Sequence, residues 1–118
     1  MVPLGKKRTI ESYLPLTPAL FHVLLALADG EKHGYVISKE IARRTDNEVN
    51  LSTGTLYGII KRLLADGLIR ESSGRGAGDE RRRSYELTPF GRDVARAEAA
   101  RLEETLAIAR RKPLFRRT

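Results

Sequence analysis

The chain has 118 residues, of which 41% are hydrophobic, and it carries a net charge of +7 and no cysteine. This length suits one domain with a modest core, and the lack of cysteine excludes disulfides, thiolate zinc sites and cysteine nucleophiles. The excess of positive charge favours a polyanionic partner, with nucleic acid ahead of an anionic membrane surface, and a cytoplasmic protein is expected.

Residues 1–16 are expected to form an irregular, basic N-terminal segment. Lys6, Lys7 and Arg8 precede an apolar run, as in a secretory leader, but an acidic residue and prolines interrupt the approach to it. The run is also too short to span a bilayer. We therefore expect a buried helix here and no membrane partner.

The apolar run is predicted to be a helix from Thr17 to Asp29. Thr17 can cap this helix, Pro18 suits its first position, and Gly30 offers a stop. Leucine, valine and phenylalanine occupy nearly every side of it, and so apolar a helix cannot leave one face in water. We expect one side to be buried in its own domain and the other against a partner chain.

Two further helices are predicted in the first half of the chain. The run "GYVISKEIARR" places Val36, Ile37 and Ile41 at helical spacing, with charged side chains outside. The third helix is predicted to begin after Ser52, whose hydroxyl can accept from a backbone amide two or three residues further on. Gly67 is predicted to end it.

Two glycines stand inside this third helix. Gly54 and Gly58 fall opposite its apolar stripe, beside Lys61 and Arg62. A glycine costs roughly 1 kcal/mol against alanine in a helix interior, so two on the exposed face need an explanation. One explanation is the close packing of a neighbouring helix, and the other is the close approach of a ligand.

The second explanation fits the surrounding residues better, because they are hydroxylic and basic rather than apolar. An α-helix fits the major groove of B-DNA, and bulky side chains would hold it away from the bases. Short hydroxyls and free amides at the positive end of the helix can meet phosphates, and the flanking tyrosine can reach a phosphate with its hydroxyl. The predicted DNA contacts in this segment are Ser52, Thr53, Gly54, Thr55, Tyr57, Gly58, Lys61 and Arg62.

A β-hairpin is predicted after the third helix. The runs "LIRESS" and "RRRSYELT" are strand-like, with Tyr85 and Leu87 alternating onto one face. Arg83 shares the parity of this inward-facing pair, so it is a weaker candidate for a DNA contact than the other arginines of the hairpin. Arginines nearer the tip can follow a DNA backbone or enter a minor groove, with a solvated loop as the alternative, and these are Arg75, Arg81 and Arg82.

A long helix is predicted over residues 89–112. Thr88 and Pro89 repeat the pattern of a capping hydroxyl followed by a proline, and the helix is rich in alanine, glutamate and arginine. Residues 113–118 are expected to form a basic tail. A narrow apolar stripe can run along the helix, formed by Phe90, Val94, Leu102 and Leu106.

Catalysis is poorly supported by this sequence. His22 lies in an apolar helix and His33 precedes a glycine at a helix start, which favours packing and capping roles. Two distant histidines without cysteine give no metal-ligand spacing. The run "GRGAGD" resembles a phosphate-binding loop, yet a strand follows it, so the amides of a helix N-terminus are missing. We predict neither an enzyme nor a cofactor site.

The predicted fold is mainly α with a small β-hairpin. Two short helices followed by a hairpin indicate a winged helix-turn-helix over residues 17–88, and residues 89–112 would form a C-terminal dimerisation helix. Two functions remain open for such a fold: sequence-specific DNA binding, or a winged-helix protein-protein interaction module without specific DNA binding. The basic face of the third helix favours binding to double-stranded DNA.

Three segments resemble the PadR family of bacterial transcriptional regulators: "LTPALFHVLLALADGEKHGYVISKEI", "LSTGTLYGIIKRLLADGLI" and "RRRSYELTPFGR". The likeness runs from about Leu16 to Lys112 and is to the short type, which has only one helix after the wing. It implies a winged-helix dimer that binds palindromic operator DNA, usually as a repressor, with a recognition helix at residues 53–62. Tyr35 would lie near the DNA backbone.

The same resemblance implies that the first and last helices pair two subunits into a homodimer. In some small relatives, hydrophobic or planar molecules enter between the subunits or beside these helices. A small hydrophobic or planar effector is therefore an option, although no residue of this chain identifies one. The residues expected at the pairing surface are Leu20, Leu24, Leu27, Val94, Leu102 and Leu106.

Overall fold

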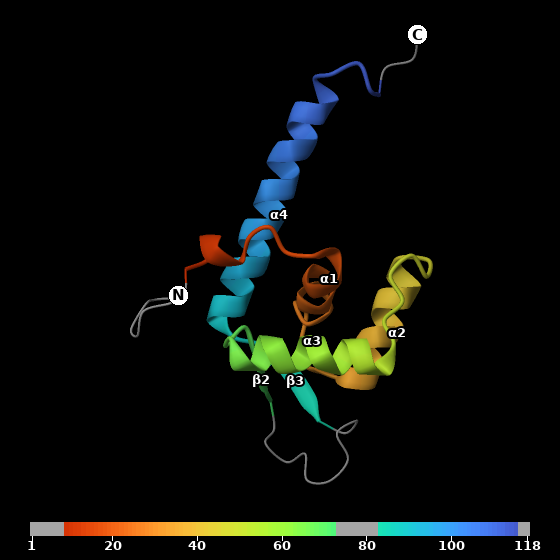
Figure 1. Ribbon diagram of the computed structural model, residues 1–118, viewed down its shortest axis with the longest axis vertical. Coiled ribbons are helices and arrows are strands. Elements are labelled where there is room, and N and C mark those ends of the chain that lie inside the picture. The colour runs from red at the N-terminus through yellow and green to blue at the C-terminus, as the bar shows by residue number, and fades with distance from the viewer. Residues whose placement is uncertain (1–8, 73–82, 116–118) are drawn as a thin grey trace.

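The computed structural model describes residues 9–72 and 83–115 (Figure 1). The body of the molecule consists of three short α-helices and a small sheet, and the long last helix begins in the body and projects away from it. The elements in chain order are η1 (Glu11–Tyr13), α1 (Pro18–Ala26), β1 (Lys32–His33), α2 (Gly34–Arg44), α3 (Thr53–Ala65), β2 (Ile69–Glu71), β3 (Ser84–Leu87) and α4 (Pro89–Arg110).

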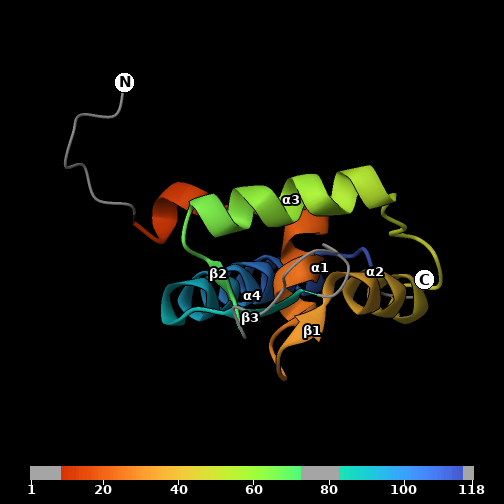
Figure 2. The same cartoon turned by 90° about the horizontal axis from the view of Figure 1, so that it is seen from below.

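The helix α3 lies along one side of the body as its outermost element. In Figure 2, α1, α2 and the sheet all lie on the same side of α3, which runs along the top of the view. One face of α3 is therefore buried in the body while the opposite face points away from the protein. None of the helices in the described ranges combines the length and apolar character that crossing a bilayer needs.

The sheet has three antiparallel strands in the order β1-β3-β2. β2 pairs with β3 through the expected hairpin, with Glu71 opposite Tyr85, and β1 pairs on the other edge with Lys32 opposite Tyr85. The sequence predicted the hairpin but not β1. Two residues are too short to show the alternation by which a strand is recognised.

The core lies between the helices and the inner face of the sheet. Tyr85 and Leu87 of β3 are buried, as their alternation predicted. At the start of α4, the backbone carbonyl of Leu68 lies so close to Gly91 that a β-carbon there would overlap it. Only glycine allows α4 to begin against this turn. The fully buried side chains include Val23, Leu24, Leu27, Ile37, Leu56, Ile60, Leu63, Leu68, Ile69 and Val94.

The N-terminal part differs in two ways from the prediction. The helix α1 begins as expected, with the Thr17 hydroxyl accepting from the Leu20 amide at 3.2 Å, but it ends at Ala26 and the chain continues as turns. Residues 9–16 are not wholly irregular. They include η1, and the Tyr13 ring meets the edge of Phe90 at 5.7 Å between centroids. This aromatic contact ties the segment to α4.

Candidate nucleic-acid interface

Both ends of α3 are fixed by capping interactions. At the start, the Ser52 hydroxyl oxygen accepts from the Thr55 amide at 3.1 Å and donates to the Thr55 hydroxyl at 3.0 Å. At the end, Gly67 takes a positive φ of 79°, and the Leu68 amide donates back to the Leu63 carbonyl at 2.9 Å. This is a Schellman closure, which satisfies the last helical carbonyls. The sequence predicted both the serine cap and the glycine stop.

The exposed face of α3 is bare. Gly54 and Gly58 are exposed, and a β-carbon built on either one meets no atom within 4 Å. In the described part of the subunit no helix packs on them, so packing within the subunit does not explain these glycines. Lys61 continues the same line one turn further along, as residues at i, i+4 and i+7 share a helix face. We refer to Gly54, Gly58 and Lys61 as the bare stripe of α3.

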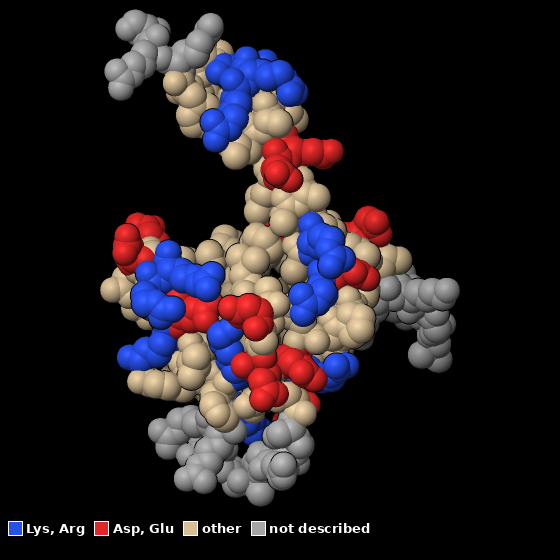
Figure 3. Space-filling model, turned by 180° about the vertical axis from the view of Figure 1, so that it is seen from behind, with Lys and Arg blue, Asp and Glu red and all other residues tan. Residues whose placement is uncertain are grey.

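The charge on this face has one sign. The helix "TGTLYGIIKRLLA" contains two cations and no acidic residue, and the side chain of Arg62 is 66% exposed, with its Nε 4.0 Å from an Asp66 carboxylate oxygen. Thr53 and Thr55 are also exposed at the positive end of the helix. Other helices carry acid–base pairs of their own, such as Arg44–Glu40 and Arg96–Asp93. Figure 3 shows acidic and basic side chains interspersed on the side of the molecule opposite α3.

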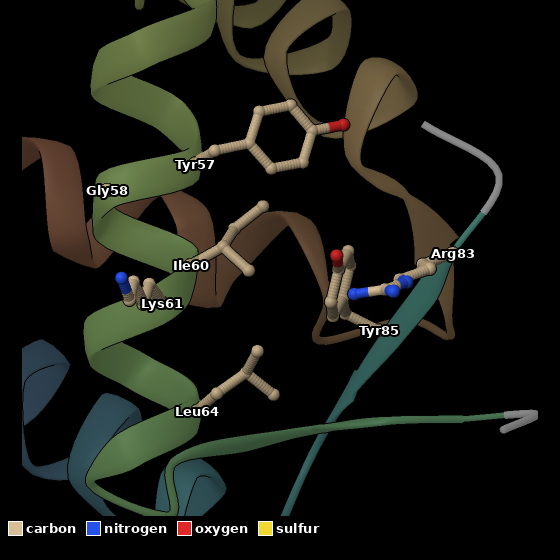
Figure 4. A pocket seen from close by; sticks show the side chains of 7 residues that line it. All are labelled: Tyr57, Gly58, Ile60, Lys61, Leu64, Arg83 and Tyr85. Atoms are coloured by element: carbon tan, nitrogen blue, oxygen red, sulfur yellow. The ribbon is translucent and has the colours of Figure 1, made fainter. Parts of the chain in front are cut away.

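Tyr57 does not lie where the sequence analysis expected it. Its ring points from α3 towards α2 (Figure 4) and rests against Gly34, and its hydroxyl is buried. The phenol therefore cannot present its hydroxyl to a phosphate on the exposed face of α3, and the expectation of a phosphate contact is corrected. Tyr57 instead packs α3 against the start of α2.

Tyr35 lies next to this contact, as the second residue of α2. It is 57% exposed, and the Lys39 Nζ lies 5.3 Å from the centre of its ring. Since its neighbour Gly34 contacts α3, Tyr35 lies at the edge of the body where α2 and α3 meet.

A cleft of about 450 Å³ separates α3 from β3 (Figure 4). Its floor includes Ile60 and Tyr85, which are buried. Arg83, the residue before β3, extends into the cleft, and its Nη1 lies 3.5 Å from a carboxylate oxygen of Glu71. Arg83 was absent from the sequence-predicted site. The predicted wing contacts Arg75, Arg81 and Arg82 lie outside the described residues. The cleft is lined by Tyr57, Gly58, Ile60, Lys61, Leu64, Arg83 and Tyr85.

The residues expected to pair two subunits fall into two groups. Leu24, Leu27 and Val94 are 0%, 1% and 0% exposed within a single subunit, so they belong to its core and offer no surface to a partner. That part of the prediction is corrected. Leu102 and Leu106, each 42% exposed, lie along α4 beyond the core, and Leu20 is half-buried.

A second groove, of about 480 Å³, runs between α1 and α4 beside these leucines. Its wall contains a carboxylate, Glu98, that is only 2% exposed. The guanidinium of Arg101 donates to both of its oxygens at 2.8 Å. These hydrogen bonds, with one from the backbone amide of Leu16, hold the pKa of Glu98 below its ordinary value although burial opposes the shift.

The two histidines play structural parts in the described residues. The Nδ1 of His33 lies 3.1 Å from the Ser84 hydroxyl oxygen and 3.4 Å from the Arg83 carbonyl oxygen, across the β1–β3 pair. His22 lines the groove between α1 and α4. Within the described residues, no three histidine, aspartate or glutamate side chains gather in a way that could hold a metal ion.

These features define a class of protein. A capped α3 with an outward bare stripe, preceded by α2 and followed by a β-hairpin, is the winged helix-turn-helix of DNA-binding regulators. The family model that matches residues 23–97 is the "Transcriptional regulator PadR-like family". The chain belongs to this family, whose members are transcriptional regulators rather than enzymes.

Curated relatives agree with this assignment. The chain is 39% identical over 83 residues to the transcriptional regulator Rv3488 of Mycobacterium tuberculosis, which covers 70% of this chain and 74% of the relative. It is 42% identical over 77 residues to an uncharacterized 37.1 kDa protein in transposon TN4556 of Streptomyces fradiae. That match covers 65% of this chain but only 21% of the Streptomyces protein.

Solved structures share the fold. A transcriptional regulator from Clostridium thermocellum superposes with a TM-score of 0.65 at 28% identity, covering 86% of this chain and 91% of the other. PadR of Bacillus subtilis, solved in complex with operator DNA, superposes with a TM-score of 0.59 at 20% identity, covering 69% and 46% of the two chains. At this lower identity the likeness concerns the fold alone.

Proposed function

We propose that this chain is a sequence-specific repressor that binds an inverted-repeat operator in double-stranded DNA as a homodimer. The observation that carries the proposal is the bare stripe of α3. A helix that keeps Gly54 and Gly58 open to solvent gives up roughly 1 kcal/mol per interior glycine, and among residues 9–72 and 83–115 no atom fills the space beside them. A major groove would use it, because base edges can approach the helix backbone there.

The remaining contacts would position α3 on the duplex. Ser52, Thr53 and Thr55 stand at the helix N-terminus with the first backbone amides, an arrangement that suits a phosphate. Lys61 and Arg62 add charge along the helix, and Tyr35 with Lys39 adds a contact at the neighbouring edge. The wing arginines Arg75, Arg81 and Arg82 would reach the adjacent backbone or minor groove.

The proposed dimer would form through α1 and α4. Leu102 and Leu106 project along α4 beyond the core, and Leu25 of α1 is 39% exposed beside the groove. Covering these side chains with a second copy would remove apolar surface from water. A twofold axis there would place the two α3 helices in successive major grooves, about 34 Å apart. The operator would accordingly be an inverted repeat.

A small hydrophobic or planar effector would fit the groove between α1 and α4. Its lining is largely apolar, with Phe21 and Leu25 on the α1 side and Leu102 on the α4 side. A molecule held there would lie where the two subunits are proposed to meet, so it could change the spacing of the α3 helices. We place the protein in the cytoplasm, where bacterial DNA lies.

The experiment that tests this proposal is footprinting on the DNA upstream of the protein's own gene. We expect protection of a twofold-symmetric site, with a binding constant that falls steeply as salt rises because several phosphates are neutralised. Binding that is weak and insensitive to salt would favour the alternative, a winged-helix module for protein-protein contacts. The repressor assignment is tested separately, by transcription from that promoter with and without the protein.

A further inference from the structure

The alternation of β3 explains why Arg83 lies in the cleft. Arg83 directly precedes the strand and continues its alternation, so it shares the face of Tyr85 and Leu87, which are buried beneath the helices. At position 83 the strand has passed the edge of the core, so the same face now looks across open space towards α3 (Figure 4). The side chains on this face are therefore buried in the middle of the sheet, whereas at the end of the strand the side chain on the same face lines the cleft.

The opposite wall of the cleft carries a second cation. Lys61 belongs to the bare stripe and also lines the cleft, and it lies on α3 while Arg83 lies just before β3 (Figure 4). The contact with Glu71 at 3.5 Å keeps the guanidinium over the cleft, where 37% of the Arg83 side chain remains exposed. Two cations, one on α3 and one just before β3, thus line the same cleft, whose floor is apolar.

We propose that this cleft seats the DNA backbone, with one phosphate held between Lys61 and Arg83. The inference rests on the proposed function, since it assumes that the bare stripe enters a major groove. A guanidinium offers its N–H donors as a planar fork that matches phosphate oxygens, and an ammonium adds a compact charge. The apolar floor of Ile60, Leu64 and the Tyr85 ring would pack against the deoxyribose next to that phosphate.

This arrangement assigns a division of roles within the site. Gly54 and Gly58 of the bare stripe lie where base edges approach, so that part of the stripe bears on sequence recognition, whereas Lys61 and Arg83 hold the backbone and carry no sequence information. Arg83 would therefore strengthen binding to operator and to unrelated duplex by the same factor. It would also tie the wing to the recognition helix across a single nucleotide, which fixes how deeply α3 can enter the groove.

The experiment compares Lys61→Gln, Arg83→Gln and the double variant with wild type, on operator and on unrelated duplex over a range of salt. Each single variant should weaken both complexes roughly tenfold at 0.1 M salt, and should reduce the salt slope by about 0.9 per subunit. Because both residues hold one phosphate, the double variant should lose clearly less than the sum of the two single losses in free energy.

Arg70→Gln is the matched control. Arg70 lies on the other face of the same sheet, paired with Glu86 at 2.8 Å. Its replacement therefore removes one positive charge, as Arg83→Gln does, without altering the cleft. Affinity and slope should stay near wild type, and circular dichroism should show all variants folded. If Arg83→Gln binds DNA as Arg70→Gln does, or if the losses at 61 and 83 are additive, the inference is overturned. Wild type that binds no duplex would instead overturn the proposed function.

Discussion

Gly34, the first residue of α2, lies directly against the phenol ring of Tyr57 in α3, so close that a β-carbon at position 34 would overlap it. The contact holds the aromatic side chain of Tyr57 inward, away from the exposed face of α3. The glycine of the "HGY" segment, at the start of α2, thus shapes the surface of α3, although it belongs to a different helix. The openness of that surface depends on packing between helices as well as on the two glycines.

Replacing Gly34 with alanine should destabilise the fold by about 1–3 kcal/mol, because the added methyl group overpacks a site that the ring already fills. Gly54→Ala is the control, since it adds the same group where nothing lies within 4 Å. Urea unfolding followed by circular dichroism measures both. Equal stability of the two variants would show that the Gly34 contact is not a constraint.

The two tyrosines near the interface should respond in opposite ways to the loss of a hydroxyl. Tyr57→Phe removes a hydroxyl that is buried towards α2, so operator affinity should stay within about twofold of wild type. Tyr35→Phe removes one from a side chain that is 57% exposed, and affinity should fall by up to about tenfold if it contacts a phosphate. Gel-shift titrations of both variants check this. A large loss for Tyr57→Phe at unchanged stability would restore the phosphate contact that we corrected.

The Glu98–Arg101 pair predicts how stability depends on acid. Hydrogen bonds from Arg101 and from the Leu16 amide lower the pKa of Glu98 in the folded state below its ordinary value of 4.5. The folded state therefore takes up this proton less readily than the unfolded chain. The stabilisation is fully present above pH 4.5 and is lost as the pH falls through the lower, folded pKa.

Unfolding midpoints measured between pH 7 and pH 3 test this pair. We expect Glu98→Gln to lower the midpoint at pH 7 and to flatten the fall of stability below pH 4.5, because glutamine has no proton to take up there. Asp93→Gln, which removes an exposed acid of the same helix, is the comparison. If the stability of Glu98→Gln falls as steeply below pH 4.5 as that of wild type, other groups cause the loss of stability in acid.

The proposed pairing surface can be broken without harming the subunit. Leu106→Glu places a charge where two subunits would meet, yet Leu106 is 42% exposed in the subunit and contributes little to its core. We expect monomers by sedimentation velocity, together with much weaker operator binding. Ala107→Glu adds the same charge one residue along, on a different face of α4, and should remain dimeric. If both variants dimerise with the same affinity, the subunits do not pair through the surface that contains Leu106.

Much of the fold followed from local sequence signals. Hydroxyl caps at Thr17, Ser52 and Thr88 each accept from the backbone amide three residues on, as such residues do at helix starts. The outward position of Gly54 and Gly58 followed from helical spacing alone. Periodicity within one helix is enough for such predictions, because each depends only on neighbours along the chain.

Other features depend on contacts between distant segments and were missed. β1 exists only because β3 lies beside it, and Tyr57 turns inward only because Gly34 leaves room. An all-apolar α1 does not reveal which leucines its own subunit buries, so Leu24 and Leu27 were assigned to the wrong surface. Each of these predictions considered one element by itself, whereas the observed position depends on how two elements pack.

The central claim is that the bare stripe of α3 exists so that DNA can approach it. Gly58→Gln tests this claim most directly, with Ala100→Gln, an exposed position on α4, as the control. We predict that Gly58→Gln is as stable as wild type or more stable by up to about 1 kcal/mol, since glutamine favours a helix over glycine, and that its operator affinity falls at least tenfold. A Gly58→Gln protein that gains stability and still binds the operator like wild type would contradict the account.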